Sequence, residues 1–282
     1  MHEPQPVNHL LAPVNRHMLL QWVQKDTLYA FDFDGTLAPI VDDPEQAFMP
    51  HATWRALAML SSLVRVAVVS GRSQMDLQRR LPAEVSYVIG NHGNEGRPIE
   101  DLTRRVEQER CCKAWMEQLQ SQKIVSTQWT HLVGLSIEDK GITLSLHYRN
   151  CANHALAHEI LSQFAAKLNP PAQIIEGLAV INLLPLHAWN KSDAMRALMA
   201  HSGCKRALFV GDDVTDELAF ATAPDNWLTA RVGCEGQSHA RYRLANTHDV
   251  CTLIELAIRR RQEATHPYFN AMQSGDHSCG AA

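Results

Sequence analysis

The fold is decided by one stretch near the N-terminus, Leu28-Tyr29-Ala30-Phe31-Asp32-Phe33-Asp34-Gly35-Thr36. Its first residues are apolar without alternation, which is typical of a strand buried on both faces of a parallel sheet. Asp32 and Asp34 stand two residues apart where that strand ends, so their side chains should point the same way. We expect both carboxylates to face the crevice at the carboxyl ends of the strands, where open α/β sheets bind ligands.

Two carboxylates this close repel each other unless a cation lies between them. A hard divalent ion with oxygen ligands meets that need, and Mg²⁺ fits where a phosphate is also bound. Gly35 and Thr36 add a tight turn, backbone amides and a hydroxyl that can bind an anion. The stretch therefore predicts a Mg²⁺-assisted phosphate site, whereas a capping Asp followed by a turn would explain only part of it.

Three further apolar runs extend this strand to a sheet, at 64–69, 86–89 and 206–210. Segments with helical spacing of apolar residues precede or follow them, at 53–63, 74–81 and 192–200. Alternation of strands and helices predicts an α/β domain with a parallel, Rossmann-like sheet and right-handed crossovers.

The alternation is interrupted between residues 104 and 185. There the chain reads in order as a helix, a hairpin, a second helix and a second hairpin, at 105–123, 131–149, 153–168 and 173–184. We therefore expect an inserted α+β domain at 104–185 and a discontinuous core made of 1–103 and 186–282. A closing helix is expected at 250–261, and the polar residues from 262 onward are expected to be disordered.

The composition is that of a soluble globular protein. The 282 residues are 45% hydrophobic and 20% charged, with a formal net charge of -4. That charge does not suggest a nucleic-acid partner, and no run is long enough to span a bilayer. The N-terminus lacks a signal-peptide pattern. The 7 scattered cysteines favour reduced thiols, so we expect a cytoplasmic protein, monomeric or weakly homo-oligomeric.

Other candidate residues also follow predicted strands or begin a helix. Ser70-Gly71-Arg72 offers a hydroxyl and amides at a helix start, a suitable phosphate cradle, although an N-cap serine explains it nearly as well. Lys191 begins another helix and could neutralise phosphate and carboxylates. Taken alone, a lysine in this position is more often a surface residue near a helix start. Gly211-Asp212-Asp213-Val214-Thr215-Asp216-Glu217 places carboxylates at a strand end, in excess of what a helix dipole needs.

In this order, the strings Asp-x-Asp-Gly-Thr, Ser-Gly-Arg, Lys and Gly-Asp-Asp-x-x-Asp resemble the motifs of the haloacid-dehalogenase-like (HAD) phosphatases. The resemblance implies a HAD core with an inserted cap domain. It implies a nucleophile at Asp32, a general acid and base at Asp34, and phosphate contacts from Ser70 and Lys191. The same resemblance, extended to the neighbouring residues, implies a set of phosphate contacts and a set of metal ligands. Phosphate would contact Gly35, Thr36, Ser70, Gly71 and Arg72. Mg²⁺ would bind Asp32, Asp212 and the backbone carbonyl of Asp34, with Asp213 or Asp216 in support.

Four strings narrow the resemblance to the trehalose-6-phosphate phosphatases. They are Gly90-Asn91-His92-Gly93-Asn94-Glu95, Glu138-Asp139-Lys140-Gly141, His147-Tyr148-Arg149 and the Gly211–Glu217 string. By this resemblance the substrate is a sugar phosphate held by the cap. The expected sugar contacts are Asn91, His92, Glu138, Lys140, His147, Arg149, Asn182 and Asp216.

The sequence departs from that family's pattern at three positions. Asn182 stands where the family usually has Glu, Leu184 replaces a basic residue, and Ser192 replaces the Gly after the motif lysine. An Asn can still hydrogen-bond a hydroxyl but carries no charge. Two alternatives therefore stay open, the same chemistry on another sugar phosphate such as glucosylglycerol phosphate, and a non-catalytic sugar-phosphate binder.

Overall fold

The computed structural model describes residues 8–41, 43–99 and 101–265, and its larger sheet has six strands in the order β10-β9-β8-β1-β2-β3. All neighbouring strands in it are parallel. The strands are β1 (Thr27–Phe31), β2 (Val66–Val69), β3 (Tyr87–Ile89), β8 (Arg206–Gly211), β9 (Trp227–Val232) and β10 (Tyr242–Leu244). The order runs outward in opposite directions from β1 and β8, which makes the β1–β8 boundary the topological switch point, where a crevice is expected.

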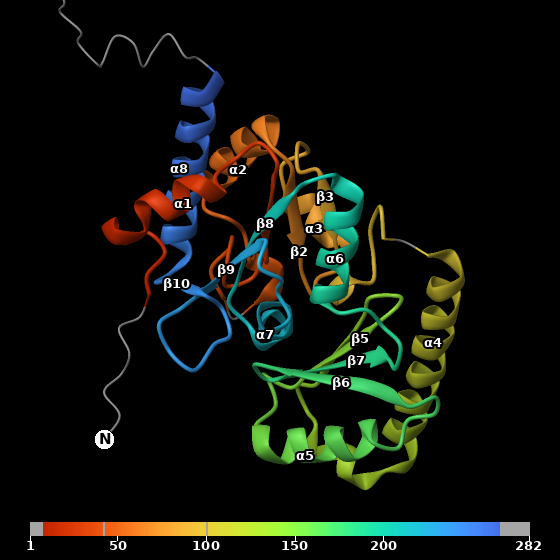
Figure 1. Cartoon of the computed structure of the whole chain (residues 1–282). Coiled ribbons are helices and arrows are strands. Elements are labelled where there is room, and N and C mark those ends of the chain that lie inside the picture. The colour runs from red at the N-terminus through yellow and green to blue at the C-terminus, as the bar shows by residue number, and fades with distance from the viewer. Residues whose placement is uncertain (1–7, 42, 100, 266–282) are drawn as a thin grey trace, which may run out of the picture.

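Helices cover both faces of this sheet, which explains the apolar strand sequences (Figure 1). In β1, Tyr29 and Phe31 pack on one face, and Leu28 and Ala30 on the other. The first face is covered by α1 (Arg16–Trp22), α2 (His51–Leu63), α3 (Gln74–Arg80) and α8 (Thr247–Thr265). The second is covered by α6 (Lys191–Ser202) and α7 (Val214–Ala221).

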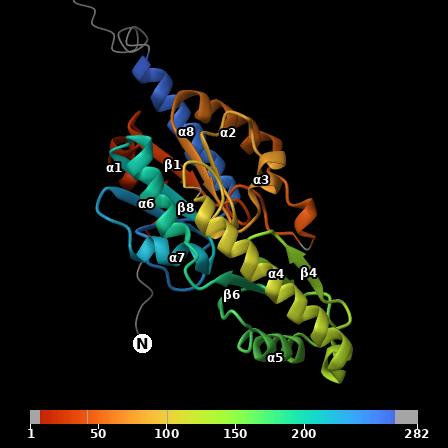
Figure 2. The ribbon, with the colours of Figure 1, turned by 90° about the vertical axis from the view of Figure 1, so that its right-hand side faces the viewer.

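A separate four-stranded antiparallel sheet forms the inserted part, in the order β4-β5-β7-β6. Its elements are α4 (Leu102–Val125), β4 (Ser136–Asp139), β5 (Leu144–His147), α5 (His154–Ala165), β6 (Ala172–Gly177) and β7 (Val180–Pro185). Leu144, Leu146, Ile181 and Leu183 pack in one cluster with residues of both helices. The opposite face of this sheet is turned toward the core (Figure 1). Figure 2 shows α4 running from the core along the insert.

The structure confirms the expected fold class, a parallel core with an antiparallel insert, and corrects several details. The hairpin expected at 131–149 has its first strand only from Ser136, because residues Thr127–His131 form a 3-10 helix and Gly134 has a φ of 96°. Four unpredicted elements, α1, α7, β9 and β10, are present. Residues 262–265 belong to α8 and are not disordered, and the rest of the expected tail, 266–282, lies outside the described residues.

Short 3-10 helices η1 to η4 complete the chain, at Pro13–Asn15, Pro44–Gln46, Asn91–Gly93 and Thr127–His131. Within the described ranges, no helix combines the length and the apolar character needed to cross a bilayer. Cys111, Cys112, Cys151, Cys204, Cys234 and Cys251 are not joined in disulfides.

Trp115 of α4 is the largest fully buried side chain of the insert, and its Nε1 donates to the carbonyl of Pro170 at 2.6 Å. Trp115→Ala should lower the free energy of unfolding by about 3–5 kcal/mol, because a large cavity opens. Urea denaturation followed by circular dichroism measures the loss. Gln120→Ala, on the exposed side of the same helix, is the control and should change the value by less than about 0.5 kcal/mol. A Trp115→Ala loss below about 1 kcal/mol would contradict this packing.

Candidate functional site

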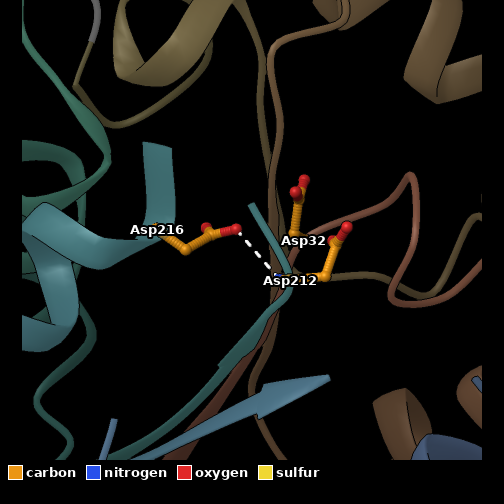
Figure 3. Close-up of side chains that lie close together, drawn as sticks. All are labelled: Asp32, Asp212 and Asp216. Atoms are coloured by element: carbon orange, nitrogen blue, oxygen red, sulfur yellow. Dashed lines mark hydrogen bonds between the residues drawn. The ribbon is translucent and has the colours of Figure 1, made fainter. Parts of the chain in front are cut away.

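Three carboxylates meet at the switch point of the larger sheet. Asp32 directly follows β1, Asp212 directly follows β8, and Asp216 lies in the first turn of α7. Each offers an oxygen, and these oxygens lie within 4.8 Å of one another (Figure 3). The side chains come together because parallel neighbours β1 and β8 end at the same edge. We call Asp32, Asp212 and Asp216 the acidic cluster.

Lys191 is the cation of this cluster. Its Nζ lies 2.8 Å from Asp32 Oδ2 and 2.9 Å from Asp216 Oδ1, and the residue is 2% exposed. The position is fixed by the start of α6, where the Asn190 side chain accepts hydrogen bonds from two backbone amides and Asp193 completes a capping box. The predicted meeting of Lys191 with the aspartates is therefore present.

Burial and charge shift the pKa values of all four groups. Burial raises the pKa of Asp32, opposed by Lys191. Burial and the charge of Asp216 raise the pKa of Asp212 to about 7, and burial likewise raises that of Asp216. Burial disfavours the Lys191 ammonium, but the carboxylates of Asp216 and Asp32 outweigh it and raise its pKa. One ammonium thus opposes three carboxylates, which leaves two negative charges when all are ionised.

The acidic cluster has the chemistry of a divalent-cation site. Its donors are all oxygens, and its uncompensated charge matches that of Mg²⁺. Thr36 Oγ1 donates to Asp212 Oδ1 at 3.0 Å and orients that carboxylate. Gly35 has a φ of 75°, and a Cβ there would lie 2.0 Å from Asp212 Oδ2, so only glycine lets the loop pass this close.

Of the two supporting carboxylates expected, Asp213 and Asp216, the structure brings Asp216 into the cluster. Asp213 is exposed and caps α7, where its carboxylate accepts from the backbone N–H of Val214. Asp216 takes the place in the cluster instead, and accepts from the backbone amides of Asp212 and Asp213 at 3.2 and 3.1 Å. Asp216 is 0% exposed, so its carboxylate faces protein groups here; the sugar contact expected from it stays a prediction.

The Asp34 carboxylate lies outside the acidic cluster, because it is paired with Arg72. The metal contact expected from Asp34 is its backbone carbonyl, which this pairing does not involve. The guanidinium donates from Nε to Oδ2 at 2.7 Å and from Nη2 to Oδ1 at 2.8 Å. It donates as well to Asp76 Oδ2 and to the carbonyl of Pro44. Arg72, expected to hold phosphate, is thus already engaged with protein groups.

The remaining residues of the expected phosphate cradle lie close to the cluster's loops. Ser70 is buried, and its Oγ accepts from the backbone N–H of Arg72 at 3.3 Å. Gly71 lies against the ring of His92, and a Cβ at Gly71 would approach His92 Cε1 to 2.5 Å. We call residues 70–72 the phosphate loop.

Several expected sugar contacts lie on the insert's face toward the core. His147 Nε2 and Glu138 Oε2 are 2.9 Å apart. Lys140 Nζ lies 3.7 Å from the same carboxylate and donates to the carbonyl of Gly71 at 3.0 Å. Burial alone would raise the pKa of the Glu138 carboxyl. The hydrogen bond with His147 and the charge of Lys140 outweigh burial and lower that pKa. Arg149 Nη1 donates to the carbonyl of Val41 in the core at 3.2 Å.

Of three other expected sugar contacts, two are hydrogen-bonded to protein groups and the third is a buried histidine. Asn182 accepts from Ser145 Oγ at 2.6 Å and donates to the carbonyl of Ile175 at 3.2 Å, within the insert's sheet. Asn91 is 0% exposed and hydrogen-bonds to protein groups. His92 is 7% exposed, and neither ring nitrogen has a hydrogen-bond partner among the described residues.

Sequence reasoning gave no role to two residues that tie the insert to the core. Thr143 bonds to Asn91, and Gln108 of α4 bonds to Asn94. Asn94 belongs to the Gly90–Glu95 string, so the string that carries the family resemblance already marked one side of the contact with Gln108. Thr143, which directly precedes β5, carried no such signal, because a threonine next to a strand is ordinary.

Asp212→Asn tests the charge balance of the cluster in metal-free protein. The folded-state pKa of about 7 lies above the ordinary value of 3.8, so ionised Asp212 destabilises the fold as pH rises from about 4 to about 7 and above. With a chelator at pH 8, the variant should be roughly 2 kcal/mol more stable than the parent, and this gain should vanish near pH 4.

Urea denaturation at intervals from pH 4 to pH 8 measures this difference. Asp225→Asn, at a fully exposed position, is the matched control and should follow the parent at every pH. An Asp212→Asn variant less stable than the parent at pH 8 without metal would refute the charge argument.

Comparison with known proteins supplies a family. The trehalose-phosphatase family matches residues 30–246. The chain is 30% identical over 207 residues to trehalose-phosphate phosphatase of Mycobacterium ulcerans (strain Agy99), covering 72% of this chain and 53% of that protein. It is 29% identical over 241 residues to trehalose-6-phosphate phosphatase of Escherichia coli (strain K12), covering 83% and 88%. The chain thus spans about half the length of the mycobacterial relative.

A solved structure described as a trehalose-6-phosphate phosphatase related protein superimposes with a TM-score of 0.70. It covers 84% of this chain and 100% of its own, at 23% identity, which shows likeness of fold. The family match over residues 30–246 takes in the acidic cluster, Lys191 and the whole antiparallel sheet. On that ground, the chain belongs to the trehalose-phosphatase family.

Proposed function

We propose that this chain hydrolyses trehalose 6-phosphate to trehalose and inorganic phosphate, with Mg²⁺ as its cofactor. One observation carries the proposal: the acidic cluster and Lys191 lie at the switch point of the parallel sheet, opposite the polar face of the inserted sheet. Anionic phosphate and a hydroxyl-rich sugar need these two kinds of surface together. The names of the mycobacterial and Escherichia coli relatives supply the substrate.

In the proposed first step, a carboxylate oxygen of Asp32 attacks phosphorus while the bond from phosphorus to the sugar oxygen breaks. The sugar oxygen takes a proton from the carboxyl group of Asp34, which frees trehalose and leaves an acyl phosphate on Asp32. Lys191 and the backbone N–H of Phe33 hold the Asp32 carboxylate at 2.8 and 2.6 Å, so its direction of attack is fixed beforehand.

In the second step, water attacks phosphorus and gives its proton to Asp34. The bond from phosphorus to Asp32 breaks, so inorganic phosphate leaves and the Asp32 carboxylate is restored. Before it can act in either step, Asp34 must separate from Arg72, which donates hydrogen bonds to both of its carboxylate oxygens. Arg72 would therefore hold Asp34 aside between turnovers.

Asp32, Asp212 and Asp216 would hold Mg²⁺, which neutralises charge on the phosphate when bound. Ser70, Thr36 and the amides after Gly35 would contact the phosphate oxygens. We further propose residues 104–185 as the cap domain and Glu138, Lys140, His147 and Arg149 as its sugar contacts, since they lie on or beside the core-facing surface of the insert.

A second substrate stays open because of Asn182. Its amide is paired with Ser145 and with the carbonyl of Ile175, so this position offers the sugar no charge. A smaller glycosyl phosphate such as glucosylglycerol phosphate, handled by the same chemistry, is the alternative.

Phosphate release from a panel of esters tests the function. With Mg²⁺, trehalose 6-phosphate should exceed glucose 6-phosphate and glucosylglycerol phosphate in kcat/KM by at least about tenfold, if the second sugar ring is gripped by the cap. Asp32→Asn should lower turnover of every ester by more than about 10³-fold, because the amide cannot form an acyl phosphate.

Asp225→Asn serves again as the control and should keep parental turnover. Equal kcat/KM for trehalose 6-phosphate and glucose 6-phosphate would rule out the proposed substrate. Retained turnover in Asp32→Asn would rule out the covalent step, whichever ester is preferred.

The sugar contacts make a separate prediction. Glu138→Gln removes the charge that pairs with His147, and should lower kcat/KM for trehalose 6-phosphate by about tenfold. Turnover of para-nitrophenyl phosphate, which carries no sugar, should change less than about twofold. Glu159→Gln, on the outer helix α5 of the insert, is the control. Equal losses on both substrates would mean that Glu138 only supports the fold.

A further inference from the structure

The turn that joins β4 and β5 docks on the core through Asn91. Thr143 Oγ1 donates to Asn91 Oδ1 at 2.7 Å, and Asn91 Nδ2 lies 3.5 Å from the carbonyl oxygen of Lys140. The backbone N–H of Lys140 donates to the carbonyl of Thr143 at 3.0 Å and closes the turn. One amide of the core therefore contacts both ends of this four-residue turn, 140–143.

The same asparagine is bonded to the phosphate loop. Its backbone N–H donates to the carbonyl of Arg72 at 2.7 Å, and that of the next residue, His92, donates to the carbonyl of Ser70 at 2.9 Å. The His92 ring fills the space against Gly71. Lys140 from the turn then donates to the carbonyl of Gly71. The turn and residues 90–92 thus hold the phosphate loop from two sides.

Asn91 has little capacity left for a ligand. It is 0% exposed, its Nδ2 donates to Glu95 Oε2 at 2.8 Å, and its Oδ1 accepts from Thr143. Its backbone is also unusual, with a φ of 50°, a conformation that asparagine tolerates better than most residues. A buried side chain whose amide oxygen and nitrogen both bond to protein groups, on a backbone of positive φ, fits a joint between two parts better than a sugar contact.

A neighbouring asparagine anchors the other end of the insert. Asn94 Oδ1 accepts from Gln108 Nε2 of α4 and from the backbone N–H of Trp189, and its Nδ2 donates to the carbonyl of Trp189. Trp189 lies in the returning linker. The loop 90–95 therefore contacts helix α4, the returning linker and the tip of the first hairpin of the insert.

We propose that Asn91 is a positioning residue that, through Thr143, sets the turn 140–143 against the phosphate loop and so places Lys140 and Glu138 over the bound ester. This inference rests on the proposed function for its effect on catalysis, but the docking itself is independent of substrate. The residue acts through Thr143 and the phosphate loop and does not touch the sugar.

Thr143→Val removes the hydroxyl and keeps the shape of the side chain. It should lower kcat/KM for trehalose 6-phosphate by about five- to tenfold, as expected for loss of one buried hydrogen bond that leaves an unpaired acceptor. Thr143→Ser keeps the hydroxyl and should stay within about twofold of the parent. Thr130→Val is the matched control, because the Thr130 hydroxyl donates to the carbonyl of Thr127 in its own turn and, within the described ranges, to no group of the core.

A double-mutant cycle tests whether Asn91 and Thr143 act through each other or make two independent contributions to kcat/KM. Asn91→Gly fits the positive φ and removes the amide, so the variant should fold. If the two side chains act through each other, Asn91→Gly with Thr143→Val should be no worse than Asn91→Gly alone. Losses that multiply, or a Thr143→Ser variant as impaired as Thr143→Val, would overturn the proposal.

Hydrogen exchange in substrate-free protein gives a readout that needs no activity. Amides of residues 138–147 should exchange at least about fivefold faster in Thr143→Val than in the parent and in Thr130→Val. Unchanged exchange would overturn the docking role. If exchange rises but no sugar phosphate is hydrolysed by any variant or by the parent, the proposed function fails while the docking stands.

Discussion

The buried contact of Lys191 with Asp32 and Asp216 is the constraint on which the site depends. Charges so far from water are tolerated only when they are paired and hydrogen-bonded. Lys191 meets both carboxylates within 2.9 Å, and the amides of Asp212 and Asp213 satisfy Asp216. The ends of β1 and β8 and the starts of α6 and α7 are therefore held in one arrangement. A divalent cation fits this arrangement, because two of its negative charges are not balanced by Lys191.

Much of the fold could be predicted from local pattern. Continuous apolar runs mark β1, β2, β3 and β8 because both faces of these strands are covered by helices. The strand β9 was not predicted, because its sequence contains Thr229 and Arg231 among apolar residues and so does not form a continuous apolar run. The structure gives a reason for the first: Thr229 is fully buried and its hydroxyl accepts from the backbone N–H of Arg241. Such a long-range partner leaves no trace in a short window of sequence.

The candidate site divides in the same way. Asp32, Asp212 and Lys191 could be placed together because each directly follows a strand or begins a helix, where topology fixes neighbours. Partners of side chains could not be predicted. Arg72 pairs with Asp34 across 38 positions, and Asn91 meets Thr143 across 52. Both pairings depend on how loops pack, so residues expected to touch substrate turned out to be bonded to protein groups.

The strand order has a consequence for synthesis of the chain. Asp32 lies in the first 35 residues, yet its partners Lys191, Asp212 and Asp216 emerge from the ribosome only after the whole insert has been made. β2 and β3 can pair beside β1 early, but the other edge of β1 waits for β8. A nascent or truncated chain that ends before α6 carries the proposed nucleophile without Lys191. The site is thus completed only near the end of synthesis. A partial product of translation contains Asp32 but not the complete acidic cluster with Lys191.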